Sequence, residues 1–278
     1  MTLGTIIIAA HNEERVIGRT LDAVGSAARE GDLAVVVVPN GCSDRTAEIA
    51  RSFPGVVVAE LDAPSKAAAL RRGDGLAGPG PRIYLDADVV MTSRAARDVV
   101  DALRRGAIAG RPPHTFDTSR ASRLVRSWYR VREDLPSIST ALWGAGCYAL
   151  SEAGRARFDE FPDVVSDDLF IDSLFARVEV SIIATDPLIV TTPRRTADLL
   201  RILRRTYRTQ SEVTAGGEGR YPGQRAQLRD LGAMLARKPR RLADAVVYVS
   251  LIALARARAR LGRRGVRWER DDSSRESG

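Results

Sequence analysis

Short apolar runs alternate with helix-like segments along the first hundred residues of the chain. The runs are rich in valine and isoleucine and lack polar alternation, which is typical of strands buried on both faces of a parallel sheet. The expected strands are 5–10, 33–38, 56–61 and 83–85. Helices are expected after His11, after Ser43 and over Ser65–Arg72, where residues that favour helix starts precede apolar positions. This order predicts a doubly wound α/β sheet, in which ligands bind beyond the carboxyl ends of the strands.

The second half of the chain is more helical and more basic. The pattern predicts a helix over 94–105, a return to the sheet through 107–109, an amphipathic helix over 118–135, a strand within 143–150 and β-structure over 178–190. The stripe of the amphipathic helix consists of Leu124, Trp128, Val131 and Leu135, and its arginines are Arg120, Arg123, Arg126 and Arg130. Those arginines are consistent either with a solvated face or with contact to an anionic acceptor or lipid headgroup.

Charge narrows the classes of partner. The 278 residues carry a formal net charge of +8, which favours anionic partners such as phosphate esters, acidic lipid surfaces or nucleic acid. Cys42 and Cys147 are isolated, so neither a disulfide framework nor a zinc site is expected, and a reducing cytoplasm fits. The N-terminus does not resemble a signal peptide. The apolar stretch 245–255 is shorter than the roughly 18 to 20 residues that span a bilayer, so a cytoplasmic protein is expected.

Two carboxylates follow the fourth expected strand. Arg82–Leu85 leads directly into Asp86-Ala87-Asp88, and apolar residues resume at once. Residues i and i+2 of a strand point to the same side, so both carboxylates can converge on one hard cation. A divalent ion such as Mg²⁺ or Mn²⁺ compensates the cost of placing two acids beside an apolar run. The segment is therefore a candidate metal site.

Four segments in order resemble the family 2 glycosyltransferases of the GT-A fold. They are 9–14 (AAHNEE), 38–46 (VPNGCSDRT), 86–88 (DAD) and 166–168 (SDD). The resemblance implies an α/β fold of GT-A type, a Rossmann-like mixed sheet flanked by helices, followed by a helical, basic C-terminal extension. The implied domains are a glycosyltransferase domain over 1–200 (nucleotide-binding half 1–105, acceptor-binding half 106–200), the extension over 201–265 and a disordered tail over 266–278.

The resemblance also implies which residues bind a nucleotide-sugar. They are Ala10, His11, Glu13, Asn40, Lys66, Asp86, Ala87 and Asp88. Asn40 stands where relatives carry an aspartate that faces the base, and an amide can also hydrogen-bond a base edge. Structural roles stay open for several of these residues: a helix-start acid for Glu13, a structural histidine at His11 and a surface lysine at Lys66.

The same resemblance assigns the chemistry. Asp88 is the first choice of metal ligand, with Asp86 holding the ribose or a metal-bound water. Asp168, with Asp167 as the alternative, would be the base that inversion at the anomeric carbon requires, although two acids at a helix start also suit simple capping. Trp143 and Gly144 would lie on the acceptor side, and a core role for Trp143 is equally open.

The expected function is therefore inverting, metal-dependent transfer of a sugar from a nucleotide-diphosphate sugar to a hydroxyl acceptor. The acceptor is a polysaccharide, a lipid-linked sugar or a natural-product intermediate. Arg201–Tyr207 only partly matches the Gln-x-x-Arg-Trp motif of processive relatives, which favours single additions. The segment 243–261, apolar and then basic, suits either packing on the domain or on a second subunit, or peripheral contact with an anionic membrane.

Three other interpretations explain the sequence less completely. A nucleotidyltransferase is disfavoured because no glycine-rich phosphate loop follows the first strand. A nucleic-acid-binding protein would explain the charge but not the acidic strand ends, so nucleic acid is not an expected partner. A degenerate, non-catalytic relative stays open because Ala9, Pro39 and Asn40 depart from the family pattern.

Overall fold

The computed structural model describes residues 2–164, 166–215 and 224–261. The chain divides into two compact units. The first unit comprises Met1–Thr115 and Leu142–Val190, and the second comprises Phe116–Ala141 and the chain from Thr191 onward. The expected tail over 266–278 and the end of the expected extension lie outside the described residues.

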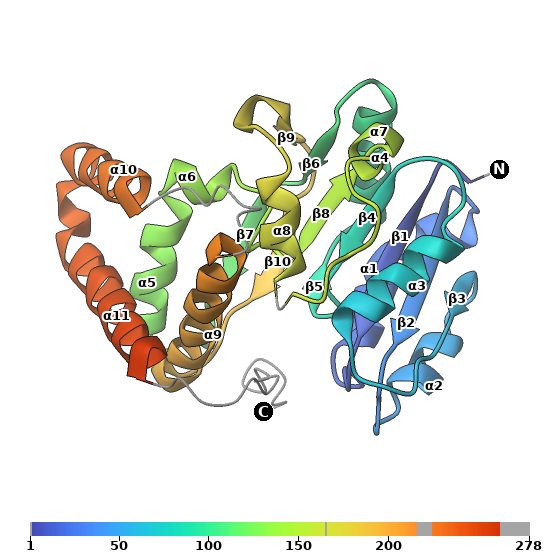
Figure 1. Ribbon diagram of the computed structural model, residues 1–278, viewed down its shortest axis with the longest axis horizontal. Helices are drawn as coiled ribbons and strands as arrows, with labels where there is room; N and C mark the ends of the chain where they lie inside the picture. The colour runs from blue at the N-terminus through green and yellow to red at the C-terminus, as the bar shows by residue number, and fades with distance from the viewer. Residues whose placement is uncertain (1, 165, 216–223, 262–278) are drawn as a thin grey trace. The chain divides into compact units, whose positions relative to one another are not determined.

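A seven-stranded mixed sheet forms the centre of the first unit, in the order β3-β2-β1-β4-β8-β6-β9 (Figure 1). Its strands are β1 (Gly4–Ala10), β2 (Leu33–Pro39), β3 (Val56–Val58), β4 (Arg82–Leu85), β6 (Ala109–Arg111), β8 (Cys147–Leu150) and β9 (Val180–Ile182). Strands β3, β2, β1 and β4 run parallel, and β8 is antiparallel to both β4 and β6. A second sheet has the order β5 (Val89–Val90), β10 (Leu188–Thr191), β7 (His114–Asp117). The prediction of a doubly wound α/β sheet is confirmed.

Helices cover both faces of the parallel strands. Ile6 and Ile8 of β1 join a core with α1 (Ile17–Arg29) and α4 (Ser93–Arg104). Ile7 points to the opposite face, where α3 (Lys66–Leu76) packs on β1 and β2. Both faces of the strand are therefore buried, which explains why the apolar runs lack polar alternation. The remaining helices of the unit are α2 (Thr46–Arg51), α7 (Glu152–Arg155), α8 (Asp167–Ser173) and the 3₁₀ turn η1 (Arg177–Glu179).

Sheet register brings four segments to one edge. Ala10 pairs with Pro39 at the carboxyl ends of β1 and β2, and Leu85 at the end of β4 pairs with Cys147 at the start of the antiparallel β8. The residues that follow or precede these pairs therefore gather at the same edge of the sheet. They are His11, Asn40, Asp86 and Gly146.

The second unit is helical where it is described. It contains α5 (Arg123–Glu133), α6 (Pro136–Ser139), α9 (Thr196–Ala215), α10 (Gln224–Arg237), η2 (Pro239–Arg241) and α11 (Leu242–Leu261). Helix α11 packs on α5 and α9, and Trp128 of α5 stacks on Tyr248 of α11 with ring centroids 5.5 Å apart. No helix among the described residues is long and apolar enough to cross a membrane.

Some expected boundaries differ from the structure. The predicted stripe of α5 is wrong at one position: Leu124 is 47% exposed, and Val125 is buried beside Trp128 and Val131. The expected division at residue 200 does not coincide with the compact units, because α5 groups with the C-terminal helices through the Trp128–Tyr248 contact. Aromatic contacts between segments more than 100 residues apart leave no periodic signal in either segment.

Candidate functional site

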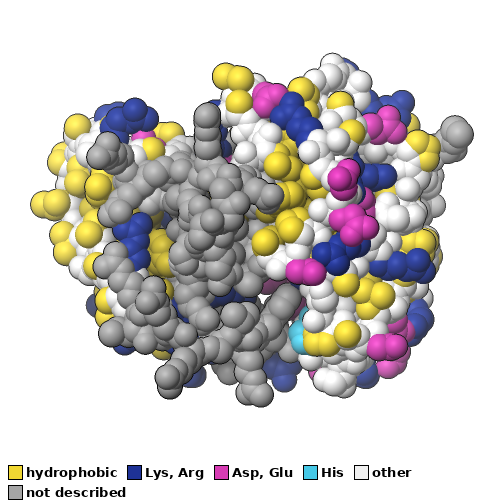
Figure 2. All heavy atoms as spheres, in the orientation of Figure 1, with side chains coloured by type: hydrophobic (Ala, Val, Ile, Leu, Met, Phe, Trp, Pro, Cys, Tyr) yellow, Lys and Arg dark blue, Asp and Glu magenta, His cyan; other side chains and the backbone are white. Residues whose placement is uncertain are grey.

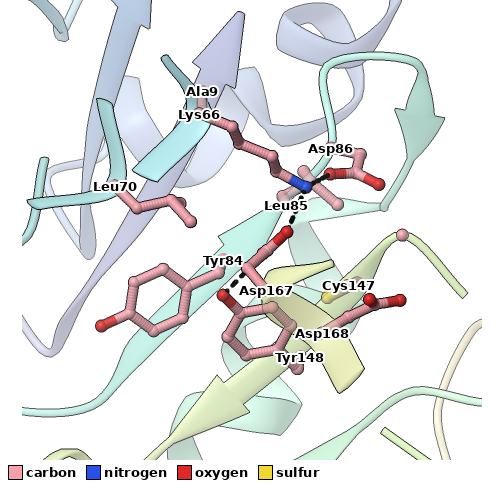
Figure 3. A pocket seen from close by; sticks show the side chains of 11 residues that line it. Ala9, Lys66, Leu70, Tyr84, Leu85, Asp86, Cys147, Tyr148, Asp167 and Asp168 are labelled. Carbon is pink, nitrogen blue, oxygen red and sulfur yellow. Dashed lines mark hydrogen bonds and ion pairs between the residues drawn. The ribbon is translucent and has the colours of Figure 1, made fainter. Parts of the chain in front are cut away.

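A small cleft that is open to solvent lies at the edge where the strand ends gather. Its lining comes from β1, α3, β4, β8 and the start of α8, all within the first unit. The lining residues are Ala9, Lys66, Leu70, Tyr84, Leu85, Asp86, Gly146, Cys147, Tyr148, Asp167 and Asp168 (Figure 3). Four of the predicted site residues thus meet in one cleft: Lys66, Asp86, Asp167 and Asp168.

Lys66 joins two acids that are 81 positions apart in the sequence. Its Nζ lies 2.8 Å from Oδ1 of Asp86 and 2.7 Å from Oδ1 of Asp167, and Figure 3 shows the ammonium between the two carboxylates. Burial alone lowers the pKa of Lys66, but the charges of Asp167 and Asp86 reverse this and hold the pKa above its usual value. Lys66 is therefore a permanent cation at the cleft. Ser65 caps α3 by accepting from the N–H of Ala68, which fixes where the lysine side chain begins.

Two stacked tyrosines pack beside Asp167, and one of them hydrogen-bonds its carboxylate. The Tyr148 hydroxyl donates to Oδ2 of Asp167 at 2.9 Å, and the rings of Tyr84 and Tyr148 stack with centroids 4.9 Å apart. The Tyr84 hydroxyl donates in turn to Asp74 at 2.6 Å, and Asp74 also pairs with Arg155 at 2.7 Å. Burial, followed by the charge of Asp167, raises the pKa of Tyr148. Tyr148 is thus a neutral donor that holds one side of Asp167 while Lys66 holds the other.

The acids of α8 also fix the loop before β8. Oδ2 of Asp168 accepts from the N–H of Gly144 at 2.8 Å, and Oδ1 of Asp172, one turn later, accepts from the N–H of Leu142 at 2.8 Å. In Figure 3 the Asp168 carboxylate points away from Lys66. Burial raises the pKa of Asp168, and the neighbouring Asp167 adds to this, so the pKa is about 6. This carboxylate is consequently a better proton acceptor near neutral pH than an ordinary aspartate.

The Asp86–Asp88 segment forms a tight turn rather than the end of a strand. The N–H of Asp86 donates to the Gly146 carbonyl at 2.8 Å, and the N–H of Val89 donates back to Asp86 at 3.2 Å. A side chain at Gly146 would meet Val89 at 2.5 Å, so this close approach requires glycine. As a result Asp86 lines the cleft, whereas Ala87 is buried and Asp88 is not among the lining residues. The expectation that the two carboxylates converge on one cation stays a prediction, now for a turn rather than for a strand end.

Asn40 ties together the ends of three segments. Its Nδ2 donates to the Ala10 carbonyl at 2.8 Å and to the Val38 carbonyl at 3.3 Å, and its Oδ1 accepts from the N–H of Ser65 at 3.0 Å. The side chain is 1% exposed. The expectation that it reads a base edge stays a prediction, but both ends of its amide already bond within the protein.

Other predicted residues lie around the cleft without lining it. His11 Nδ1 lies 2.6 Å from the Asn40 carbonyl oxygen, and the N–H of Glu13 donates to Thr46 at 2.7 Å. Trp143 is 5% exposed, which fits its core interpretation better than a sugar-stacking face. Among the described residues, no group of three or more His, Cys, Asp or Glu is arranged to hold a metal ion.

The sequence did not indicate a role in the cleft for Tyr148, Tyr84, Gly146 or the other apolar lining residues. Tyr148 lies in a segment correctly predicted as a strand. Its direction toward Asp167 depends on β8 pairing with β4, in which Tyr148 lies opposite Tyr84. In the sequence, only Gly144 and Gly146, just before β8, indicated that another segment of backbone approaches closely.

Comparison with known proteins gives both a family and a fold. The family described as "Glycosyl transferase family 2" matches residues 5–155. No curated protein matched the chain by sequence. A mannosyltransferase from Pyrobaculum calidifontis is structurally similar, with a TM-score of 0.58 and 20% identity over 93% of this chain and 75% of that one. Similar values hold for glucosyl-3-phosphoglycerate synthase from Mycobacterium tuberculosis (TM-score 0.54, 16% identity, 79% and 81% coverage). A fragment of S. aureus TarS gives a TM-score of 0.51 and 14% identity, with 97% and 94% coverage. The expected GT-A fold is confirmed.

We predict that Asn40→Asp destabilises the protein by about 2 kcal/mol or more at neutral pH, because a carboxylate cannot donate to the Ala10 and Val38 carbonyls. A matched control is Asn12→Asp. Oδ1 of Asn12 accepts hydrogen bonds from the N–H and the hydroxyl of Ser43, and a carboxylate can still accept both.

Thermal denaturation of both variants and the wild type as a function of pH measures this loss of stability. The penalty of Asn40→Asp should shrink as pH falls, since the carboxyl group regains a donor when it is protonated. Equal stability of the two variants at neutral pH would contradict the role given to Asn40.

Proposed function

Because the chain belongs to glycosyl transferase family 2 and is a glycosyltransferase, we propose that its cleft transfers a sugar from a nucleotide-diphosphate sugar to a hydroxyl acceptor. The observation that carries the proposal is the fixed cation Lys66 between Asp86 and Asp167, at the edge where the strand ends gather. A permanent positive charge and a raised-pKa carboxylate in one cleft suit a reaction with an anionic leaving group and a nucleophile that must lose a proton.

The donor class is inferred from similar structures. The Pyrobaculum calidifontis mannosyltransferase is described in complex with GDP-Man and Mn²⁺, and the TarS fragment in complex with UDP. In this chain the nucleotide would lie along the ends of β1 and β2, against Ala10, His11 and Glu13. The diphosphate would then reach Lys66, whose ammonium is a compact point charge suited to phosphate oxygens.

A divalent cation fits the residues that are present. Asp86 offers a carboxylate whose side chain is 42% exposed at the cleft, although the described residues contain no three-ligand protein cage. Mg²⁺ is commonly held by one or two carboxylates together with substrate phosphates, so a single well-placed aspartate is sufficient. Asp86 would hold the ion, with Asp88 as a second or water-mediated ligand. When bound, such an ion supplies charge neutralisation for the leaving diphosphate.

Asp168 is proposed as the general base. Asp167 is committed to Lys66 and Tyr148, whereas Asp168 is held by the N–H of Gly144 and has a pKa of about 6. The acceptor oxygen attacks the anomeric carbon, its proton passes to the Asp168 carboxylate, and the bond to the phosphate oxygen breaks on the opposite face. The nucleoside diphosphate leaves, and the configuration at the anomeric carbon inverts.

The acceptor would approach over the turn at Trp143 and Gly144. It is a hydroxyl of a polysaccharide, a lipid-linked sugar or a natural-product intermediate. Because Trp143 is buried, the backbone of the turn rather than the indole ring is the proposed contact. The incomplete motif at Arg201–Tyr207 supports transfer of one sugar at a time. We also propose that the enzyme is cytoplasmic and associates peripherally with a membrane. It would act either as a monomer or as a homodimer.

Replacing the base should separate chemistry from donor binding. Asp168→Asn is expected to lower kcat by about 10²–10⁴ with little change in the donor KM, because the amide keeps the bond from Gly144 but accepts no proton. In the wild-type enzyme kcat should fall as pH drops below about 6, since the base becomes protonated. Initial rates over a pH series check both expectations.

The matched control is Asp163→Asn, at an exposed acid of the loop before α8 that pairs with Arg71. Its rates should equal those of the wild type. Full turnover in Asp168→Asn together with loss in Asp167→Asn would transfer the role of base to Asp167.

The raised pKa of Asp168 also predicts a stability effect. The folded protein binds this proton more readily than the unfolded chain, so the ionised carboxylate destabilises the fold above its folded pKa of about 6. Asp168→Asn should therefore be more stable than the wild type at pH 8, and the difference should fade as pH falls through 6 toward 4. A constant difference across this range would contradict the assigned shift.

The two acids of the turn can be ranked by cation binding. Thermal denaturation of Asp86→Ala and Asp88→Ala with UDP or GDP, with and without Mn²⁺, measures the stabilisation that the ion adds. We expect Asp86→Ala to lose nearly all of it and Asp88→Ala to retain most, because Asp86 lines the cleft. The reverse order would make Asp88 the primary ligand.

Tyr148 should matter for catalysis and its stacked neighbour should not. Tyr148→Phe removes one of the two anchors of Asp167 and is expected to lower kcat about tenfold or more. The matched control is Tyr84→Phe, an equally buried tyrosine whose hydroxyl bonds Asp74 instead. Each variant should lose about 1–3 kcal/mol of stability, since each removes a bond to a buried acid. Equal kinetic effects of the two variants would show that Tyr148 has only a structural role.

A further inference from the structure

Helix α11 is apolar on two faces, and one of them packs within the second unit. Ala245, Tyr248, Ile252 and Ala255 are buried, and Tyr248 stacks on Trp128 of α5. The helix contacts α5 and α9 through this side. A soluble helix that packs on one side usually presents charged residues on the other.

The opposite face of α11 does not follow that rule. Leu242 is 60% exposed, Val246 59%, Val249 45% and Leu254 40%, and the small residues Ala243, Ser250, Ala253 and Ala257 are exposed beside them. Their spacing of three and four residues aligns them along the helix. Figure 2 shows hydrophobic side chains gathered where Figure 1 places α10 and α11. At 1.5 Å per residue, the stripe from Leu242 to Ala257 is about 22 Å long.

The charges around this face are positive. Arg237 and Arg240 are exposed just before α11, and Arg258 is exposed near its end, one turn after Leu254. The sequence of α11 contains one acid, Asp244, whose side chain is 13% exposed and pairs with Arg241 and Arg130. The exposed stripe therefore carries no negative charge and is flanked by arginines at both ends.

We propose that this face of α11 docks on an anionic lipid bilayer, with the apolar stripe inserted at the interface and the flanking arginines on the lipid headgroups. Interfacial helices combine an apolar face with cationic residues in this way. An anionic surface complements the arginines at both ends of the stripe at once. A second copy of the chain does not, because either a parallel or an antiparallel pairing of two α11 helices brings arginines against arginines. The proposal is independent of the chemistry assigned to the cleft.

Sedimentation with lipid vesicles tests the docking face in the full-length protein. We expect binding to vesicles of phosphatidylcholine mixed with phosphatidylglycerol, weak binding to phosphatidylcholine alone, and weakening by salt. Val246→Glu places a charge in the stripe and should reduce binding at least tenfold. The matched control Val178→Glu, at a valine that is 95% exposed in η1 of the first unit, should bind as the wild type does. Arg240→Gln with Arg258→Gln should lower binding about fivefold for each arginine removed.

Circular dichroism measures whether each variant is folded and at what temperature it melts, and light scattering measures its oligomeric state. Both valine variants should melt near the wild-type temperature, because the substituted side chains are exposed. Failure of the wild type to bind anionic vesicles, or undiminished binding of folded Val246→Glu, would overturn the proposal. A wild-type dimer that Val246→Glu converts to a monomer, without vesicle binding by either protein, would overturn it in favour of a second copy. Equal binding to neutral and anionic vesicles would refute the role of the arginines.

Discussion

The ion pairs of Lys66 with Asp86 and Asp167 are the interaction on which the cleft depends. Three charged groups at the end of a buried sheet are costly unless they compensate one another. Here an ammonium lies within 2.8 Å of both carboxylates, and Tyr148 satisfies a further oxygen of Asp167. The arrangement retains one excess negative charge on the three groups, beside the raised-pKa carboxylate of Asp168. It therefore presents both a cation for phosphate and a carboxylate for a divalent ion.

The fold supplies this geometry through the order of its strands. Parallel β1 and β4 end at the same edge, and the antiparallel β8 begins there. Helix α8 contributes two acids to the cleft and, through Asp168 and Asp172, holds the loop that precedes β8. The same loop then accepts the N–H of Asp86 through Gly146. Asp86 and the acids of α8 are consequently connected through hydrogen bonds to the backbone of this loop.

Much of the first unit could be predicted from the sequence, because its strands are apolar on both faces and its helices begin at residues such as Ser65. Lys66, Asp86, Asp167 and Asp168, to which the family resemblance assigned roles, line the same cleft, since each directly follows or begins a regular element. The turn at Asp86–Asp88 was not predictable, because its direction depends on the contact with Gly146, 60 residues away. The role of Tyr148 depends in the same way on strand register.

Helical periodicity was less informative in the second unit. The one-position difference at Leu124 and Val125 reflects packing against α11 and α9, which periodicity within α5 does not specify. Most of α11 before Arg256 is apolar on both its packed and its exposed face, so its sequence pattern did not distinguish one from the other. The structure resolves the two faces through the stacking of Tyr248 on Trp128.

A crystal structure with Mn²⁺ and either UDP or GDP would test the central claim most directly. We expect the diphosphate within hydrogen-bond distance of Lys66 Nζ, the ion on the Asp86 carboxylate, and Asp167 still bonded to Tyr148. A nucleotide bound elsewhere on the protein, with Lys66 still closed on both carboxylates, would contradict it.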